Sequence, residues 1–168
     1  MAAWIRLSGL LFTLLLVPGM QAQAQGEVII SEPSYLDKQY MHRQRELLAD
    51  LLARNYGARF SGRTERDLPL LQRLLDDQLV RNNQTRELQA MGIIMGDLLA
   101  VELGLHWVIY EDRIGRSRAL RYKDTDNYLF PATMISRRRE VDNRARVTDI
   151  YRKAVDSFTP VIPRLPFQ

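Results

Sequence analysis

The alternation of apolar and polar side chains first becomes regular between residues 34 and 56, where apolar positions recur at helical spacing. Ser34 with Asp37 resembles an N-cap pair, and Gly57 fits the left-handed position that ends such a helix. The pattern therefore predicts one long helix, whose buried stripe is made of Leu36, Tyr40, Leu47, Leu48, Leu51, Leu52 and Tyr56.

Two more helices are expected before the chain changes its pattern. Asp67 is predicted to cap the second helix, with Pro69 tolerated in its first turn. The third helix begins near residue 83 or 85 and stops at Gly104. Its middle, residues 91–101, is apolar on nearly every side, which is typical of a buried central helix.

Strand signals follow the third helix. Three stretches are rich in strand-forming side chains and are separated by turn residues, namely 107–110, 117–122 and 128–130. We expect an antiparallel meander whose first turn, residues 112–115, holds Gly115 at positive φ. Residues 28–30 fit an edge strand.

The pattern ends in helices and prolines. A short helix is predicted from Pro131 to about Arg139, and an amphipathic helix spans residues 147–158. The expected fold is α+β: N-terminal helices, a small antiparallel β-meander of about three strands packed on a buried central helix, and a C-terminal helix. The predicted parts are a cleavable signal peptide, an N-terminal lead-in and helix, one main domain and a proline-rich tail, over residues 1–24, 25–66, 67–158 and 159–168.

The first residues predict export. Arg6 precedes an apolar run, 7–17, and Ala22-Gln23-Ala24 reads as a small-x-small cleavage site. The run is well short of the ~20 residues of a membrane-spanning helix. We expect cleavage after Ala24, no membrane span in the mature chain, and a periplasmic location; a secreted product and an uncleaved anchor are the alternatives.

Charge is nearly balanced, with 24 lysines and arginines against 20 acidic residues, and almost all the cations are arginines. Because the two signs are mixed along the chain, the charge lacks the clustering of a nucleic-acid footprint. We predict no nucleic-acid partner. Arg137-Arg138-Arg139 is interpreted as a short, solvated run at a helix C-terminus.

Several blocks of residues follow one another in a distinctive order. They are Leu88-Gln89-Ala90-Met91-Gly92, Met95-Gly96-Asp97, residues 102–108, Glu111-Asp112 with Gly115-Arg116, residues 119–122, Leu129-Phe130-Pro131 and Met134-Ile135-Ser136. Through these blocks the stretch from about 68 to 158 resembles the bacterial domain-of-unknown-function family numbered 3806. The resemblance implies a fold and no activity.

Familiar catalytic sets are missing from the sequence. His42 and His106 are its histidines, cysteine is absent, and no serine lies in a Gly-x-Ser-x-Gly elbow. His106 follows Glu102 by one helical turn, but a pair without a third ligand is weak evidence for a metal site. We therefore expect no metal and no cofactor.

Two glycines share one face of the third helix. Glycine inside a helix costs roughly 1 kcal/mol relative to alanine, so Gly92 and Gly96 indicate a close approach to the backbone. A packed neighbouring helix or strand is the first explanation, and a ligand lying in the groove is the second. Trp107, Asp112 and Gly115 are given structural roles in the strands and their turn.

Asp97 interrupts an apolar row, because Ile93 and Val101 lie one helical turn on either side of it. A buried carboxylate needs a partner, and Arg116, Arg118 and Arg121 are the candidates. Asp97 is therefore either half of a structural ion pair or part of a polar ligand site with the arginines at 116 and 121.

These observations favour a non-catalytic envelope protein that binds another protein or a small polar ligand. The alternative is a hydrolase-type enzyme that uses carboxylates and arginines, with Glu111, Asp112 and Asp97 as acid and base. A pocket that joins two carboxylates would favour the enzyme. An exposed apolar patch of several hundred Å² would favour a protein-binding module.

Overall fold

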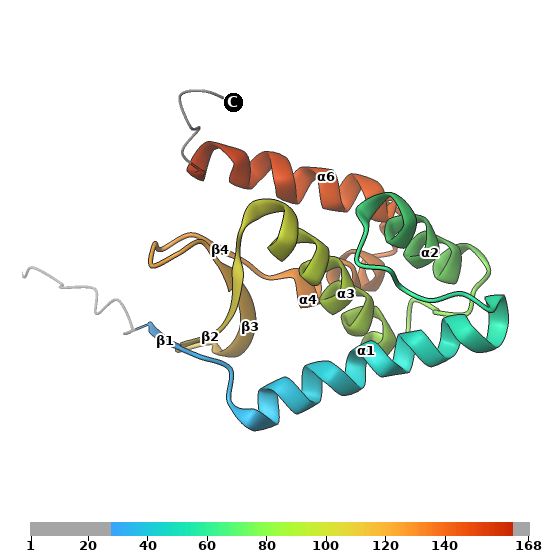
Figure 1. Ribbon diagram of the computed structural model, residues 1–168, viewed down its shortest axis with the longest axis horizontal. Coiled ribbons are helices and arrows are strands. Elements are labelled where there is room, and N and C mark those ends of the chain that lie inside the picture. The colour runs from blue at the N-terminus through green and yellow to red at the C-terminus, as the bar shows by residue number, and fades with distance from the viewer. Residues whose placement is uncertain (1–27, 163–168) are drawn as a thin grey trace, which may run out of the picture.

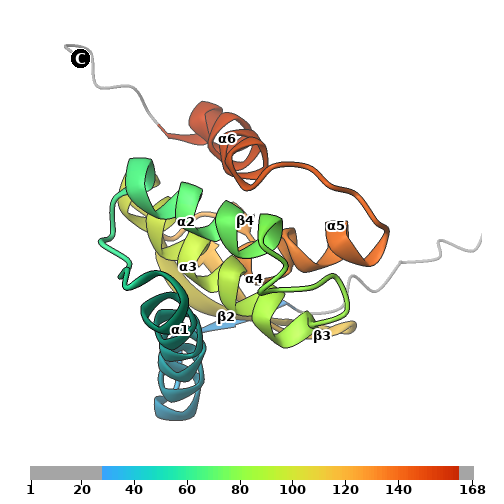
Figure 2. The ribbon, with the colours of Figure 1, turned by 90° about the vertical axis from the view of Figure 1, so that its right-hand side faces the viewer.

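Helix α3 (Thr85–Leu103) lies at the centre of the computed structural model, which describes residues 28–162. Eleven of its residues are buried, because apolar side chains cover nearly all of its surface. Helix α1 (Tyr35–Tyr56) runs below it and α6 (Val147–Phe158) above it in Figure 1, and Figure 2 shows the same order. The predicted bounds of α6, the start of α3 at residue 85 and its end at Gly104 are confirmed.

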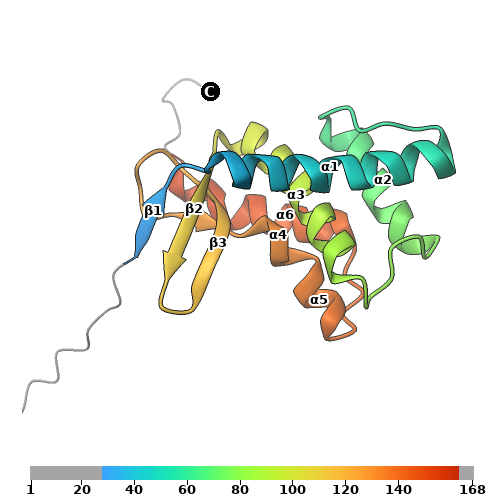
Figure 3. The ribbon, with the colours of Figure 1, turned by 90° about the horizontal axis from the view of Figure 1, so that it is seen from below.

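A four-stranded antiparallel sheet closes one end of the helices (Figure 3). Its strands lie in the order of the sequence and are β1 (Ile29–Ser31), β2 (His106–Asp112), β3 (Gly115–Arg121) and β4 (Tyr128–Leu129). The predicted meander is thus extended by β1, which pairs with β2 as an edge strand. The α+β class is confirmed.

The turn between β2 and β3 is held by the side chain of Asp112. Its Oδ1 accepts hydrogen bonds from the backbone N–H groups of Ile114, at 2.8 Å, and Gly115, at 3.1 Å. Asp112 and Gly115 are paired in register, and Gly115 has φ 150°, a region that favours glycine. The turn therefore has the positive φ that the sequence predicted.

The segment after β4 approaches α3 at its glycines. It forms two short helices, α4 (Pro131–Met134) and α5 (Ser136–Glu140), rather than the single helix predicted. A Cβ added at Gly92 would lie 2.4 Å from the carbonyl oxygen of Pro131, and one at Gly96 would lie 2.5 Å from the Trp107 ring. Both glycines therefore allow the close packing that was the first explanation for them.

The capping of α1 is confirmed, and its predicted stripe is confirmed at Leu48 and Leu52, which are fully buried, but is wrong at Leu36. Ser34 and Asp37 form a reciprocal capping box. Leu36 is 70% exposed, because the helix turns its next position toward the sheet. The residues of α1 that are buried are Asp37, Met41, Gln44, Leu48 and Leu52.

Helix α2 (Thr64–Asp76) begins earlier than the sequence predicted. Asp67 lies in its first turn, and its carboxylate accepts hydrogen bonds from the backbone N–H groups of Ser61 and Gly62. The prediction that Asp67 caps the helix is wrong, since it caps the preceding loop instead.

Within residues 28–162, every helix is too short or too polar to cross a membrane. A 3-10 turn (Thr159–Val161) follows α6. The predicted signal peptide, the lead-in up to residue 27 and the last residues of the proline-rich tail lie outside the described residues.

Candidate functional site

Asp97 finds its partner on α1, not on the hairpin. Arg45 donates to it from Nε at 2.6 Å and from Nη2 at 2.7 Å, and Trp107 Nε1 donates at 3.0 Å. The side chains of Arg45 and Asp97 are each 34% exposed. Val101, one helical turn after Asp97, is 80% exposed, so this face of α3 reaches the surface at its C-terminal end. The predicted pairing with Arg116, Arg118 or Arg121 is wrong.

Arg121 lies apart from the other hairpin arginines. Side chains alternate between the two faces of a strand, so position 121 points away from positions 116 and 118. Its Nε donates to the carbonyl oxygen of Thr125 at 2.7 Å, and its guanidinium lies 5.7 Å from the centre of the Tyr128 ring. Asp97, Arg116 and Arg121 therefore do not form one cluster.

Two hairpin arginines instead converge on Asp37 at the start of α1. Arg116 donates from Nη1 at 2.8 Å and from Nη2 at 2.6 Å, and Arg118 Nη2 donates at 3.1 Å. The Asp37 side chain is 4% exposed, and the bond from Arg116 holds the pKa of this carboxyl well below its usual range. Further bonds from Ser34 lower it in the same direction, although burial opposes them.

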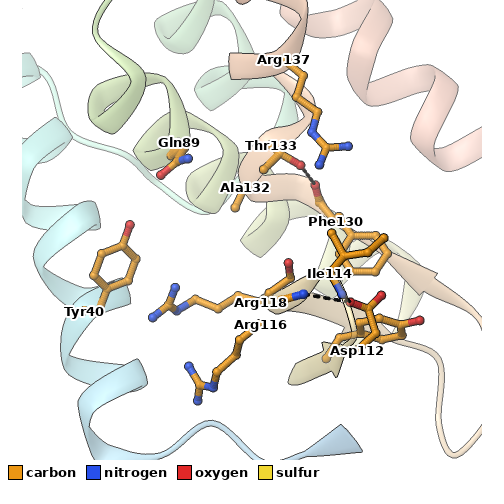
Figure 4. A pocket seen from close by; sticks show the side chains of 13 residues that line it. Tyr40, Gln89, Asp112, Ile114, Arg116, Arg118, Phe130, Ala132, Thr133 and Arg137 are labelled. Carbon is orange, nitrogen blue, oxygen red and sulfur yellow. Dashed lines mark hydrogen bonds between the residues drawn. The ribbon is translucent and has the colours of Figure 1, made fainter. Parts of the chain in front are cut away.

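A hollow of about 420 Å³ opens beside this cluster. We call it the hairpin cavity, and Figure 4 shows that its lining comes from α1, α3, the β2–β3 hairpin and the segment after β4. Its lining residues include Tyr40, Gln89, Tyr110, Asp112, Arg116, Arg118, Phe130 and Arg137.

Among the charged residues that line the hairpin cavity, arginines outnumber carboxylates. Arg116, Arg118 and Arg137 supply three guanidinium groups, whereas the lining carboxylate is Asp112, which is bound by the backbone of its own turn. Arg137 has no ion-pair or side-chain hydrogen-bond partner among residues 28–162. The buried Arg118 Nε also has no partner there, so its N–H is a donor that nothing in this part of the chain satisfies.

Aromatic rings form another part of the wall. The Arg118 guanidinium lies 4.0 Å from the centre of the Tyr40 ring. Across the hairpin cavity, Tyr110 meets Phe130 edge to face, with ring centres 5.3 Å apart. Guanidinium groups beside aromatic rings suit a ligand in which an anionic group is attached to a flat, apolar body.

Sequence reasoning missed several residues of the hairpin cavity. Tyr40 was assigned to a buried stripe, Asp37 was recognised as a cap alone, and Arg137 was assigned to a solvated run. The spacing of Arg116 and Arg118, two apart on one strand, is the signal that places both on one face.

The structure separates the other candidates for catalysis. Asp97 lines a second hollow with Arg45, whereas Asp112 lines the hairpin cavity. His106 begins β2 rather than continuing α3 after Glu102. Glu102 accepts a hydrogen bond of 2.6 Å from the Tyr151 hydroxyl. Within residues 28–162, no three histidine, aspartate or glutamate side chains gather as a metal site.

Comparison with known proteins identifies the family. The family model described as "Domain of unknown function (DUF3806)" matches residues 67–151. The chain belongs to the DUF3806 family. The match contains α3 and the whole hairpin, whereas Tyr40 and Asp37 on α1 lie before it.

A crystal structure from Bacteroides thetaiotaomicron VPI-5482 has a similar fold, with a TM-score of 0.70 and 18% sequence identity. The similarity covers 77% of this DUF3806 chain and 48% of the other chain, so the present chain spans about half of that protein. At this identity the likeness concerns the fold alone. A search of curated proteins found no match.

Proposed function

We propose that this DUF3806 protein is an exported, non-catalytic binding module whose hairpin cavity takes a small anionic ligand with a flat, apolar body. The observation that carries the proposal is the excess of three guanidinium groups over two carboxylates, since Asp37 is shared by Arg116 and Arg118 and Asp112 is bound by its own turn. Arg137 is an exposed lining residue without a side-chain partner among the described residues, so its guanidinium is free to meet a bound anion. Tyr40, Tyr110 and Phe130 supply the surface for the flat body.

The hydrolase-type alternative has less support. It needs two carboxylates in one pocket, with at least one held in its protonated form. Asp97 and Asp112 line different hollows, and the strongly shifted carboxyl, Asp37, stays ionised because its pKa is lowered.

Binding is tested with phenyl phosphate, which joins an anion to a ring. Nuclear magnetic resonance titration of the mature chain should give saturable amide shifts in the hairpin and at residues 132–137. Arg137→Gln should weaken binding about tenfold, since a hydrogen bond to a charged group contributes about 1.5 kcal/mol or more. Arg43→Gln is the control, because Arg43 is an exposed cation on α1 outside the hairpin cavity.

Phenyl phosphate binding that is equally strong in Arg137→Gln and in Arg43→Gln would contradict the proposed site. Absence of any saturable shift would count against an anionic ligand and turn attention to a protein partner.

Export, the other half of the proposal, is supported by the apolar run and the small-x-small site at residues 22–24. Mass spectrometry of the protein from its native cells should find Gln25 as the first residue. An intact Met1 terminus would contradict export by this route.

A further inference from the structure

Arg139 is a buried cation without a counter-ion. Its residue is 9% exposed, and it makes no ion pair and no side-chain hydrogen bond with any of residues 28–162. Arginine stays charged under all ordinary conditions, so the guanidinium of this largely enclosed side chain needs water or an anion as its partner. The sequence interpretation of residues 137–139 as a solvated run is therefore wrong at its last position.

A hollow of about 470 Å³ lies against this side chain, and we call it the Arg139 cavity. Its lining comes from α2, the loop after it, α5 and the loop after α5, and includes Arg81, Arg139 and Arg144 together with one carboxylate, Asp76. It shares no lining residue with the hairpin cavity. Three arginines thus line one small hollow beside a single carboxylate, and the charge of Arg144 acts against that of Arg139.

Asp76 and Asp142 lie near Arg139 but make no ion pair with it. Asp76 accepts a hydrogen bond of 2.7 Å from Gln72 Nε2. Asp142 accepts one of 3.2 Å from Asn82 Nδ2, and it lies 3.8 Å from Arg144 Nε. Burial lowers the pKa of Arg139, and the two carboxylates oppose this through space without touching it.

We infer that the Arg139 cavity is a second anion site, distinct from the hairpin cavity, that binds a small oxyanion of the phosphate or carboxylate class. The anion lies between Arg139, Arg81 and Arg144, while Gln72 and Asn82 also line the hollow and Asp76 is held by the Gln72 amide. Guanidinium groups bind such oxygens through paired N–H donors. The cavity has too few apolar walls for the flat body expected in the hairpin cavity, so a compact, highly charged solute fits best.

The test is a nuclear magnetic resonance titration with inorganic phosphate and a second one with succinate, a carboxylate. Each is compared with sodium chloride at equal ionic strength. The amide chemical shifts of residues 78–82 and 139–144 should change saturably with phosphate or with succinate. The anion that binds more tightly identifies the chemical class of the oxyanion. Arg81→Gln should weaken that binding about tenfold, since Arg81 is exposed and its loss leaves the core intact. Arg43→Gln should leave the binding unchanged.

Arg139→Met gives a second, independent measurement. In chloride alone this substitution should raise Tm, because an apolar side chain of similar volume replaces an unpaired buried charge. It should also remove the rise in Tm that the bound anion causes in the unmodified protein. A lower Tm together with unchanged anion binding would overturn the inference, and so would the absence of saturable shifts at residues 78–82. Chemical-shift changes confined to the hairpin would contradict an anion site in the Arg139 cavity but would leave the proposed function of the hairpin cavity unaffected.

Discussion

Asp37→Asn removes the charge at the point where α1 meets the hairpin, while it keeps the shape of the side chain. The carboxylate is almost fully buried and accepts two hydrogen bonds from Arg116 and one from Arg118. It also accepts from the backbone N–H of Ser34, a bond that the asparagine oxygen can still accept. The substitution therefore tests the charge separately from the helix cap.

The expected loss of stability is about 2–3 kcal/mol. Breaking a buried ion pair costs about 3–5 kcal/mol when the remaining charge stays buried. The Arg116 side chain is 43% exposed and regains water, which reduces the loss, whereas that of Arg118 is 26% exposed and regains less. Unless it rotates, the asparagine amide also turns its NH2 group toward the guanidinium groups. Because donors then face donors, this contact makes the loss of stability larger again.

Urea unfolding of the mature chain, followed by Trp107 fluorescence, measures this difference. Asp50→Asn is the control, because Asp50 is an exposed carboxylate on the same helix, and its stability should change by less than about 0.5 kcal/mol. A loss for Asp37→Asn no larger than that of the control would refute the reasoning.

The pH dependence gives a second check. The pKa of Asp37 is lower in the folded protein than its ordinary value of 3.8, so its contribution to stability is complete above that value. The contribution is lost as pH falls through the lowered, folded pKa. The gap between the unmodified protein and Asp37→Asn should therefore be constant above about pH 5 and narrow below about pH 4. A gap that widens in acid would contradict the assignment.

Three other substitutions test the packing by the same unfolding measurement. Gly92→Ala should destabilise the protein by about 2 kcal/mol or more, because the contact of 2.4 Å with the Pro131 carbonyl oxygen outweighs a helix-propensity gain of about 1 kcal/mol; an increase in stability would contradict it. Gly115→Val should cost roughly 1–3 kcal/mol through backbone strain alone, since nothing lies within 4 Å of the added Cβ; an unchanged midpoint would show that the backbone accepts a side chain here. Asp97→Ala should cost about 1–2 kcal/mol, less than a buried pair, because the Arg45 side chain is 34% exposed and regains water; a loss above 4 kcal/mol would show that the pair is effectively buried.

Local features of this protein were predictable from its sequence. Gly57 and Gly104 end their helices in the left-handed region, the Ser34–Asp37 cap forms, and the hairpin turns at Asp112–Gly115. Each of these depends on residues a few positions apart, which are neighbours whatever the rest of the chain does. The burial of α3 was equally clear, because apolar residues surround it.

Partners across long stretches of chain were decided by the tertiary structure. Asp97 binds Arg45, 52 residues away, and Asp37 binds Arg116, 79 residues away. Both pairs depend on the angle at which α1 is rotated about its axis, and one position along a helix changes that angle by about 100°. The predicted stripe chose Leu36 where the fold buries Asp37, so it missed the residue that draws the two arginines into the hairpin cavity.

The three consecutive arginines of α5 also have surroundings that the tertiary structure decides. Arg137 lines the hairpin cavity, Arg138 donates to the carbonyl oxygen of Met134, and Arg139 is buried against α2. The sequence determined that three like charges stand in a row. Their different environments arise because successive residues of a helical turn face different directions, and only the packing of α5 between its neighbours determines what lies in each direction.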